Sequence, residues 1–239
     1  MEKFLLRHVE NELADHIPGD DPRARRFRQD LSRLNAFAMT DRAMARALLT
    51  NFRDAVPREL VDLGAGDGAF MLRVARRLAP RWRDVTVKLV DQQDIVSAQV
   101  RSSFAALRWN VQTIRADVFE FLQTMQPSAD IIIANGFLHH FTGEHLARLL
   151  DLAARKTKLF VAYEPRRTHF AREASRFVWL LGCGEVIRRD VVTSVRAGFI
   201  GTEISACWPI RDDWTIVERE AGPFSHVFIA RRESQPSRV

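Results

Sequence analysis

The spacing of apolar residues divides the chain into two parts. In the first part, apolar residues recur at helical spacing with arginine and aspartate between them: Phe27, Leu31, Leu34 and Phe37. A second helix is predicted over Ala43–Leu49, with Asp41 as its N-cap. Because no strand pattern is visible here, residues 1–55 are expected to form an N-terminal helical cap.

From Glu59 onward, short apolar runs alternate with stretches of helical spacing. The runs predict seven strands: Leu60–Leu63, Val85–Val90, Val111–Ile114, Asp130–Ala134, Leu159–Tyr163, Trp214–Arg219 and Phe224–Ala230. The stretches predict helices: Ala69–Leu78, Ile95–Leu107, Val118–Met125, Glu144–Leu152, Thr168–Leu181 and Asp190–Gly198. Such alternation predicts an α/β domain, with a mostly parallel sheet covered by helices on both faces.

The last two predicted strands are connected differently from the others. Only Ala221, Gly222 and Pro223 join them, whereas a parallel connection needs roughly a dozen residues or more. We therefore expect an antiparallel hairpin, with the last strand inserted antiparallel to the rest. The domain is expected over residues 56–232, with a helical insertion at about 168–196 and a polar tail at 233–239.

Composition limits the possible classes of protein. With 239 residues, 46% of them hydrophobic, the chain can bury a full core without metals or disulfides. Cys183 and Cys207 cannot form a disulfide framework and suggest a reducing compartment or simple core use. The apolar runs fall far short of the roughly 20 residues that a bilayer needs, and Phe4–Leu6 is too short for a signal peptide. We expect a soluble, cytoplasmic protein with no membrane contact.

The formal net charge of +6 does not by itself predict a nucleic-acid partner. Only four of the 36 basic residues are lysines, and the arginines are scattered along the chain. A skew of this kind more often reflects GC-rich coding than a nucleic-acid surface, so nucleic acid is not the expected partner.

A glycine-rich turn follows the first predicted strand. Gly64, Gly66 and Gly68 form a G-x-G-x-G run, with Asp62 two residues before it. A strand-to-helix turn of this form lets the backbone approach a ligand and presents helix N–H groups. The spacing differs from the G-x-G-x-x-G of dinucleotide enzymes, which disfavours a nicotinamide dehydrogenase.

Acidic residues follow the next two predicted strands. Asp91 ends the second strand, where a carboxylate can accept hydrogen bonds from both hydroxyls of a ribose. Asp117 ends the third, where it can meet an adenine amino group or simply cap the following helix. Both are expected at the carboxyl edge of the sheet, where ligands of open α/β sheets bind.

In this order, the glycine turn, Asp91 and Asp117 resemble the motifs of class I methyltransferases that bind S-adenosylmethionine (SAM). The resemblance covers roughly Glu59–Arg232, including the closing hairpin, and implies a Rossmann-like fold. It implies that the turn holds the amino-acid part of SAM, that Asp91 holds the ribose, and that Asp117 with Val118 flanks the adenine. The implied cofactor-binding residues are Asp62, Gly64, Ala65, Gly66, Gly68, Asp91, Gln92, Asp117, Val118 and Asn135.

The segment after the fourth strand carries the candidate base. Histidine suits proton removal from a hydroxyl group because its pKa lies near working pH, and Glu164 at the end of the fifth strand could hold its second ring nitrogen. The run Phe137–His145 resembles the hydrophobic-x-His-Asp-Trp-x-x-Glu-His segment of O-methyltransferases that act on phenols. That resemblance implies His139 as the base and Glu164 as its partner.

The run departs from that pattern at two positions. His140 stands in place of the aspartate and Phe141 in place of the tryptophan, so His140 is a second candidate for the base. The run looks equally like bacterial methyltransferases of quinone and polyketide pathways. His139 in a capping or packing role is the structural alternative, and His145 is expected on the surface of a helix.

Several kinds of methyltransferase are disfavoured by this sequence. Asn135–Leu138 contains no proline, unlike the loop of enzymes that methylate nucleic-acid amino groups, and the cysteines lie outside this region. Asp130 starts its strand and is expected at the far edge of the sheet, which leaves no carboxylate cluster for a divalent metal. We therefore predict no metal.

The acceptor pocket is expected from segments outside the sheet, namely the N-terminal helices and the insertion. Its candidate apolar residues are Phe37, Met39, Phe170, Phe177, Trp179 and Leu180, for each of which core packing is the alternative. Arg166 and Arg167 follow Glu164 and could meet an acidic acceptor or the SAM carboxylate, or form surface pairs.

These observations favour a metal-independent SAM methyltransferase that acts, as a monomer or homodimer, on a small hydrophobic acceptor. A phenolic or polyketide-derived hydroxyl group is the expected acceptor. The alternatives are an RNA or protein methyltransferase, which would use the arginine surplus, and a non-catalytic SAM-binding partner protein.

Overall fold

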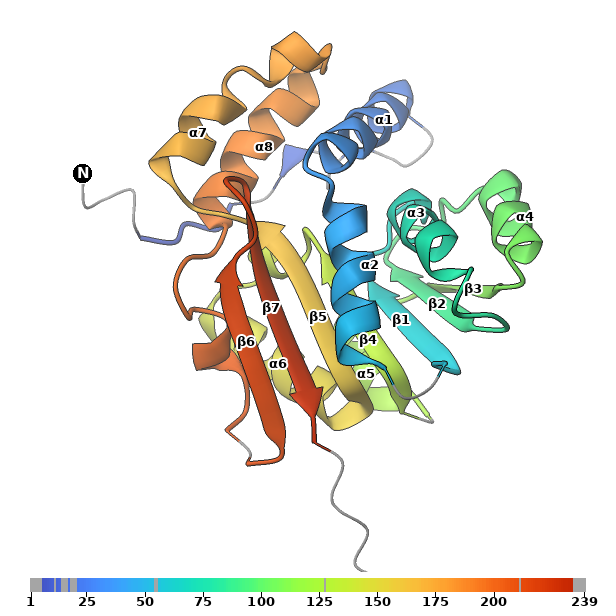
Figure 1. The fold of residues 1–239 in the computed structure, drawn as a ribbon. Helices are drawn as coiled ribbons and strands as arrows, with labels where there is room; N and C mark the ends of the chain where they lie inside the picture. The colour runs from blue at the N-terminus through green and yellow to red at the C-terminus, as the bar shows by residue number, and fades with distance from the viewer. Residues whose placement is uncertain are drawn as a thin grey trace, which may run out of the picture.

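The computed structural model describes residues 6–10, 12–13, 17, 21–53, 56–126, 128–210 and 212–233. Its centre is a seven-stranded sheet of order β3-β2-β1-β4-β5-β7-β6 (Figure 1). The strands are β1 (Glu59–Leu63), β2 (Thr86–Asp91), β3 (Asn110–Arg115), β4 (Ala129–Asn135), β5 (Thr157–Pro165), β6 (Trp214–Glu220) and β7 (Ser225–Arg232). Each predicted strand is found within two residues of its expected ends. Apart from residue 233, the predicted polar tail lies outside the described residues.

The direction of the strands confirms the predicted topology. Strands β1 to β5 run parallel to one another. Strand β7 lies between β5 and β6 and pairs antiparallel with both, so it alone of these strands runs against the rest. Its short connection to β6 leaves no room for a crossover helix, which is the physical reason for the reversal.

Separate hydrophobic clusters cover the two faces of the sheet. Because side chains alternate along a strand, Ile131 and Ile133 enter one cluster, and Ile132 between them enters the other. Helices α3 (Ala69–Leu78) and α4 (Ala98–Ala106) contribute to the first cluster, and α5 (Val118–Thr124) and α6 (Gly143–Lys156) contribute to the second (Figure 1). Both faces are therefore filled with side chains, and the carboxyl edge of the sheet is left for a ligand.

Helix α2 (Thr40–Asn51) packs on the sheet, although the sequence places it in the N-terminal cap. Met44 is fully buried in the first cluster. The N-cap is Met39, which has the left-handed φ of 53°, so the predicted cap at Asp41 is wrong. Asp41 lies in the first helical turn, where it is buried and its Oδ2 accepts a hydrogen bond of 2.6 Å from Arg77.

Helix α1 and the insertion together cover the carboxyl edge (Figure 1). The cap consists of α1 (Pro22–Phe37), α7 (His169–Ser175), the 3₁₀ helix η4 (Val178–Leu181) and α8 (Glu185–Ala197). Phe27 and Leu34 of α1 pack against Ile187 of α8, which joins two segments far apart in the sequence. The helix predicted over Thr168–Leu181 is divided into α7 and η4. Among the described residues, no helix combines the length and apolarity that crossing a membrane requires.

Candidate active site

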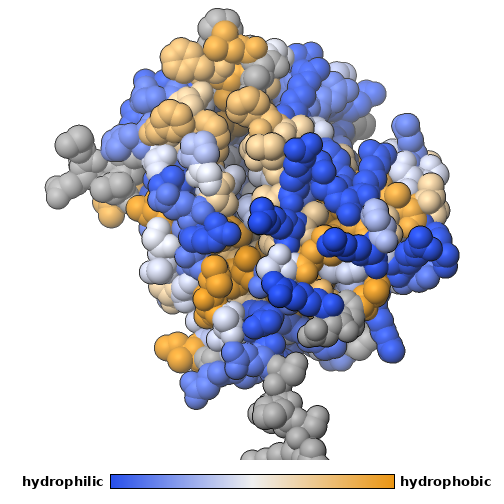
Figure 2. Space-filling model, in the orientation of Figure 1, coloured by the Kyte–Doolittle hydropathy of each residue, from blue (hydrophilic) through white to orange (hydrophobic). Residues whose placement is uncertain are grey.

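A cavity of about 1110 Å³ lies between the carboxyl edge of the sheet and the cap. From the sheet side it is lined by loops that follow β1 to β5, including Gly64, Asp91, Gln92, Asp117, Val118, Asn135 and Glu164. From the cap side it is lined by apolar side chains of α1, α7, η4 and α8. In the orientation of Figure 2, apolar side chains gather over the part of the surface where the cap lies.

The glycine turn after β1 requires glycine at its first position. Gly64, Gly66 and Gly68 all have positive φ, of 70°, 55° and 75°. A Cβ on Gly64 would lie 2.2 Å from the ring of Phe137, which is closer than two carbon atoms can approach. The amide of Gly64 also donates a hydrogen bond of 2.9 Å to the carbonyl of Val90. Of the predicted turn residues, Gly64 lines the cavity, and Ala65, Gly66 and Gly68 do not.

Asp91 connects the end of β2 to this turn. Its Oδ2 accepts a hydrogen bond of 2.9 Å from the amide of Gly66, and its Oδ1 accepts one of 2.9 Å from Gln93. Asp91 also lines the cavity, as predicted for a residue at this strand end. Asp62 does not line it. Burial, together with the charge of Asp91, raises the pKa of Asp62 to about 8, so this carboxyl group carries a proton at neutral pH.

Asp117 has the capping role, which is one of the two roles that the sequence left open, and the adenine contact stays a prediction. Its Oδ1 accepts hydrogen bonds of 2.8 and 3.3 Å from the amides of Phe119 and Glu120, so it is the N-cap of α5. It also lines the cavity beside Val118, and Gln92 Nε2 donates to its Oδ2 at 3.4 Å. Asn135, at the end of β4, lines the same side of the cavity.

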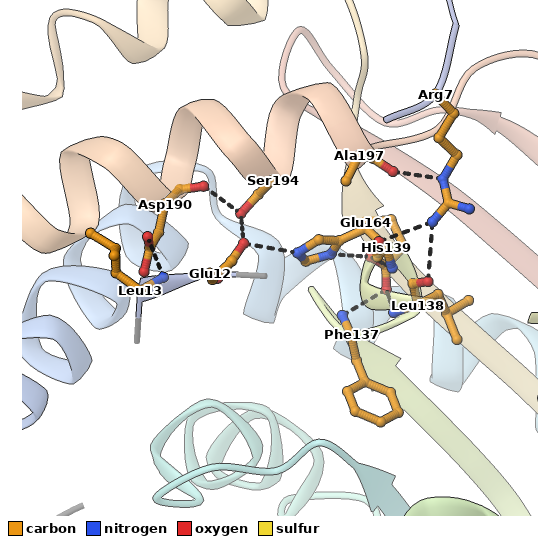
Figure 3. Close-up of polar contacts among 10 residues, drawn as sticks. All are labelled: Arg7, Glu12, Leu13, Phe137, Leu138, His139, Glu164, Asp190, Ser194 and Ala197. Carbon is orange, nitrogen blue, oxygen red and sulfur yellow. Dashed lines mark hydrogen bonds and ion pairs between the residues drawn. The ribbon is translucent and has the colours of Figure 1, made fainter. Parts of the chain in front are cut away.

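His139 lies in the short 3₁₀ helix η3 (Leu138–His140), where Glu164 at the end of β5 holds it (Figure 3). Nδ1 of His139 lies 2.8 Å from Oε2 of Glu164. The same carboxylate accepts hydrogen bonds from three successive backbone amides, those of Phe137 and Leu138 at 2.9 and 2.8 Å and that of His139 at 3.2 Å. The predicted pair therefore meets, and the loop is folded around the carboxylate.

Glu12 is a site residue that the sequence did not indicate. Its Oε1 lies 3.3 Å from Nε2 of His139, on the side opposite Glu164, and Ser194 Oγ donates a hydrogen bond to it. Glu12 is buried and lines the cavity. It stands in a polar N-terminal segment with other acidic residues nearby, such as Glu10, and no spacing pattern sets it apart.

The two carboxylates control the charge of His139. Burial alone lowers the pKa of this imidazole, but the hydrogen bonds and charges of Glu12 and Glu164 outweigh burial and raise the pKa to about 9. Burial alone would raise the pKa of Glu164, but its hydrogen bond to His139 and those from the backbone amides hold that pKa below its usual value. In this arrangement both ring nitrogens donate, and His139 is an imidazolium at neutral pH.

The other two histidines of the run lie where the sequence suggests. His140 is half-buried and lines the cavity, with its ring centroid 4.3 Å from that of His139. His145 is exposed on α6. Polar atoms of Glu12, His139 and His140 lie within 4.8 Å of one another. Because Glu12 contacts His139 directly, we interpret this group as an ion pair with a neighbouring imidazole, and metal-free chemistry stays a prediction.

The predicted acceptor residues divide into two groups. Phe37, Phe170, Phe177 and Leu180 line the cavity, while Met39 lies outside it and the side chain of Trp179 is outside the described part of the chain. Arg166 and Arg167 do not line it either, because each forms an ion pair, with Glu220 and Glu203 respectively. Further apolar residues of the cap that line the cavity are Phe27, Leu31, Leu34, Val178, Ile187, Val191 and Val195. Polar residues of the cap, such as Asn35, Glu173 and Asp190, also line it.

Residues 60–158 match a family model described as a methyltransferase domain. A search of curated protein sequences found no significant match.

Solved structures share the fold at low sequence identity. An O-methyltransferase family protein from Burkholderia thailandensis aligns with a TM-score of 0.59 and 18% identity, over 92% of this chain and 65% of that chain. The plantazolicin methyltransferase BpumL, solved with a triazolic desmethylPZN analog and SAH, aligns with a TM-score of 0.65 and 13% identity, over 89% of this chain and 92% of that one. A structure titled "Conversion of a Disulfide Bond into a Thioacetal Group during Echinomycin Biosynthesis" aligns with a TM-score of 0.53 and 15% identity, over 81% of this chain and 82% of that chain.

The family match covers the segment that carries the glycine turn, Asp91, Asp117 and His139. The shared fold extends beyond that segment to most of the chain. These comparisons show a match to a methyltransferase domain over residues 60–158 and a fold shared with solved methyltransferase structures over most of the chain.

Proposed function

We propose that this protein transfers the methyl group of SAM, without a metal ion, to a hydroxyl group of a small hydrophobic acceptor, phenolic or polyketide-derived. One observation carries the proposal. His139, fixed by Glu164, opens onto the same cavity as Gly64 and Asp91, so a base and a cofactor crevice share one space.

The charge of the cavity favours a cationic cofactor. Among the described residues, the lining includes no arginine and no lysine. It includes six residues with carboxylate side chains: Glu12, Asp91, Asp117, Glu164, Glu173 and Asp190. A dinucleotide would bring an anionic pyrophosphate into this space, which like charges oppose. SAM carries a positively charged sulfonium and supplies an activated methyl group, so the residues present fit it.

The glycine turn and the strand ends are suited to hold that cofactor. Gly64 presents backbone without a side chain, while Asp91 and Gln92 offer acceptors to a ribose. Val118 offers an apolar contact for an adenine, and Asp117 lines the same space. Asn135 stands between this region and His139 at the end of β4.

The chemistry left to the protein is alignment and proton removal. The acceptor oxygen forms a bond to the methyl carbon while the carbon–sulfur bond breaks, and the sulfur keeps the electron pair. The hydroxyl proton passes to Nε2 of His139. Glu164 fixes Nδ1–H, so Nε2 is the nitrogen that can accept, and its carboxylate stabilises the imidazolium that forms.

The cap side of the cavity favours a small hydrophobic acceptor. Its walls are aromatic and aliphatic, with rings from α1 and α7 at Phe37 and Phe170. An RNA acceptor finds less support, because a cluster of arginines lies in a separate pocket of α2 and α3, at Arg42, Arg46 and Arg77. Relatives of the same fold include proteins named as an O-methyltransferase and as the plantazolicin methyltransferase, which agrees with an acceptor of modest size.

Two measurements test the proposal. Calorimetry with SAM, SAH and NADH is expected to show binding of the first two only. Mass spectrometry of reactions with simple phenols, such as 4-methylphenol and 1-naphthol, is expected to show addition of one methyl group to oxygen. Binding of NADH in place of SAM, or methylation of nitrogen only, would contradict the proposal.

A further inference from the structure

The nitrogen of His139 that faces the cavity contacts Glu12 in this structure (Figure 3). The two contacts of the imidazole differ in length, 2.8 Å to Glu164 and 3.3 Å to Glu12. Charge-assisted N–H···O bonds are typically about 2.7–2.9 Å. The Glu164 contact is therefore a full hydrogen bond, and the Glu12 contact is the longer and more readily exchanged of the two.

Glu12 is held in place from α8 and not by the sheet. Ser194 Oγ donates to its carboxylate, and Oδ1 of Asp190, one helical turn earlier, accepts a hydrogen bond of 3.0 Å from the amide of Leu13 (Figure 3). Glu12 itself is 7% exposed. Burying a carboxylate costs free energy of folding unless the charge is paired. The contact with the imidazole and the hydrogen bond from Ser194 therefore indicate a fixed position for Glu12 beside His139.

We propose that Glu12 is a positioning residue of the transfer reaction: it holds the cavity-facing nitrogen of His139 until the acceptor's hydroxyl group replaces it, and it stabilises the imidazolium that proton transfer then leaves. The proposal rests on the proposed role of His139 as the base. It adds a second carboxylate, supplied by the N-terminal segment, to the pair formed by His139 and Glu164.

The exchange conserves protons. Before the acceptor binds, Nδ1–H faces Glu164 and Nε2–H faces Glu12. The Nε2 proton leaves to solvent before the acceptor's hydroxyl group donates to this nitrogen. Methyl transfer then returns a proton from the acceptor to Nε2, and the imidazolium is again paired with Glu12 as the neutral methyl ether departs.

Several charged or titratable groups lie around His139: Glu164 from β5, Glu12 and Arg7 from the N-terminal segment, and His140 from η3. Asp190 of α8 lines the same cavity, and its side chain accepts a hydrogen bond from the amide of Leu13. Arg7 donates to the carbonyl oxygens of Leu138 and His139, so it contacts the backbone of the loop. Glu12 and Glu164 contact the imidazole itself. Removing the carboxylate of Glu12 should therefore lower the pKa of His139.

The test follows the ionisation of His139 directly, by NMR titration of the full chain with ¹³Cε1-labelled histidine. The His139 signal is assigned by its loss in His139→Gln. In Glu12→Gln we expect the pKa of His139 to fall by about one unit or more, because a nearby charge shifts a pKa by roughly 1–3 units. Glu10→Gln is the matched control, since Glu10 is exposed on the same segment and pairs with His8 and Arg196.

A second readout separates positioning from a merely structural role. In Glu12→Gln, the acid limb of kcat/KM for 4-methylphenol or 1-naphthol should move to lower pH, whereas a loosened segment would lower the rate equally at every pH. Ser194→Ala removes one hydrogen bond to Glu12 and should give a smaller shift in the same direction, which keeps the test available if Glu12→Gln does not fold.

An unchanged His139 titration in Glu12→Gln, or one matched by Glu10→Gln, would overturn the proposal. Failure of the proposed function has a different signature: wild-type protein that binds SAM and methylates neither probe. That result would contradict the claim that an acceptor hydroxyl group replaces Glu12 at His139. The NMR titration would still report whether Glu12 raises the pKa of the imidazole.

Discussion

The sheet side and the cap side of the cavity are built in different ways. On the sheet side, ligand-facing groups follow strand ends in a fixed order, and much of the surface is backbone held by Gly64 and Asp91. On the cap side, the lining comes from α1, α7, η4 and α8, whose side chains are partly exposed, with Phe170 at 62% and Phe177 at 57%. The first side carries hydrogen-bonded turns and strand-end carboxylates, and the second carries partly exposed apolar side chains.

His139 and Glu12 stand where the two sides meet. Glu164 fixes His139 from the sheet, and α8 fixes Glu12 from the cap. We therefore expect substitutions on the sheet side to change cofactor binding and substitutions on the cap side to change acceptor binding. Substitution of the His139 imidazole, which lies between the two sides, should change the rate of the reaction.

The largest expected effect belongs to the imidazole itself. His139→Gln should lower kcat by about 10²–10⁴-fold, the usual contribution of a general base, while SAM affinity measured by calorimetry stays the same. His145→Gln is the control, because His145 is exposed on α6. Unchanged turnover in His139→Gln would remove this residue from the mechanism and leave the cofactor side intact.

The reaction should depend strongly on pH. The pKa of His139 is raised to about 9, so the neutral imidazole that can accept a proton decreases roughly tenfold for each pH unit below that value. We expect kcat/KM to rise about 50-fold between pH 7 and pH 9, because about 1% of the imidazole is neutral at pH 7 and about half is neutral at pH 9. SAM binding measured over the same range separates this effect from the cofactor, and a flat profile would contradict a base at His139.

A substitution in the glycine turn should lower the stability of the sheet side of the cavity. Gly64→Ala places a Cβ at positive φ and against the ring of Phe137, whereas Gly66→Ala meets only the unfavourable φ. Overpacking typically costs about 1–3 kcal/mol, so Gly64→Ala should lower the free energy of unfolding by that much more than Gly66→Ala. Chemical denaturation measures the difference. Equal losses of unfolding free energy in the two variants would show that the Phe137 ring moves aside without cost.

A substitution in the cap should act on the acceptor side alone. Phe177→Ala should raise the KM for a phenolic acceptor about tenfold, since partial burial of a ring contributes roughly 1–1.5 kcal/mol. SAM affinity should be unaffected. Ile216→Ala, at an exposed apolar position of β6, is the control. A loss of SAM affinity in Phe177→Ala would show that the two sides are not separate.

The smallest expected effect is that of metal removal. Treatment with EDTA or 1,10-phenanthroline should leave the rate unchanged, because alignment and proton removal need no Lewis acid in the proposed reaction. A loss of activity that a divalent ion restores would contradict metal-free transfer and would give Glu12, His139 and His140 a different role.

The elements of the sheet could be predicted because each depends on a local pattern. Apolar runs such as Asp130–Ala134 are buried on both faces, and the short link before β7 dictates its direction. Asp91 and His139 could be placed at one edge because parallel strands share their carboxyl ends. Helix α2 could not be assigned, because the same apolar stripe suits a cap or a sheet, and only the packing of Met44 decides between them.

What the sequence determined by itself is the sheet side of the cavity: a glycine turn, two strand-end carboxylates and a histidine with its glutamate, all set by positions along consecutive strands. What only the tertiary structure decided is the cap side. Glu12 reaches His139 from more than a hundred residues away, and Phe27 meets Ile187 across the cap. Contacts of this kind depend on where α8 and the N-terminal segment pack, and no local spacing of residues records that geometry.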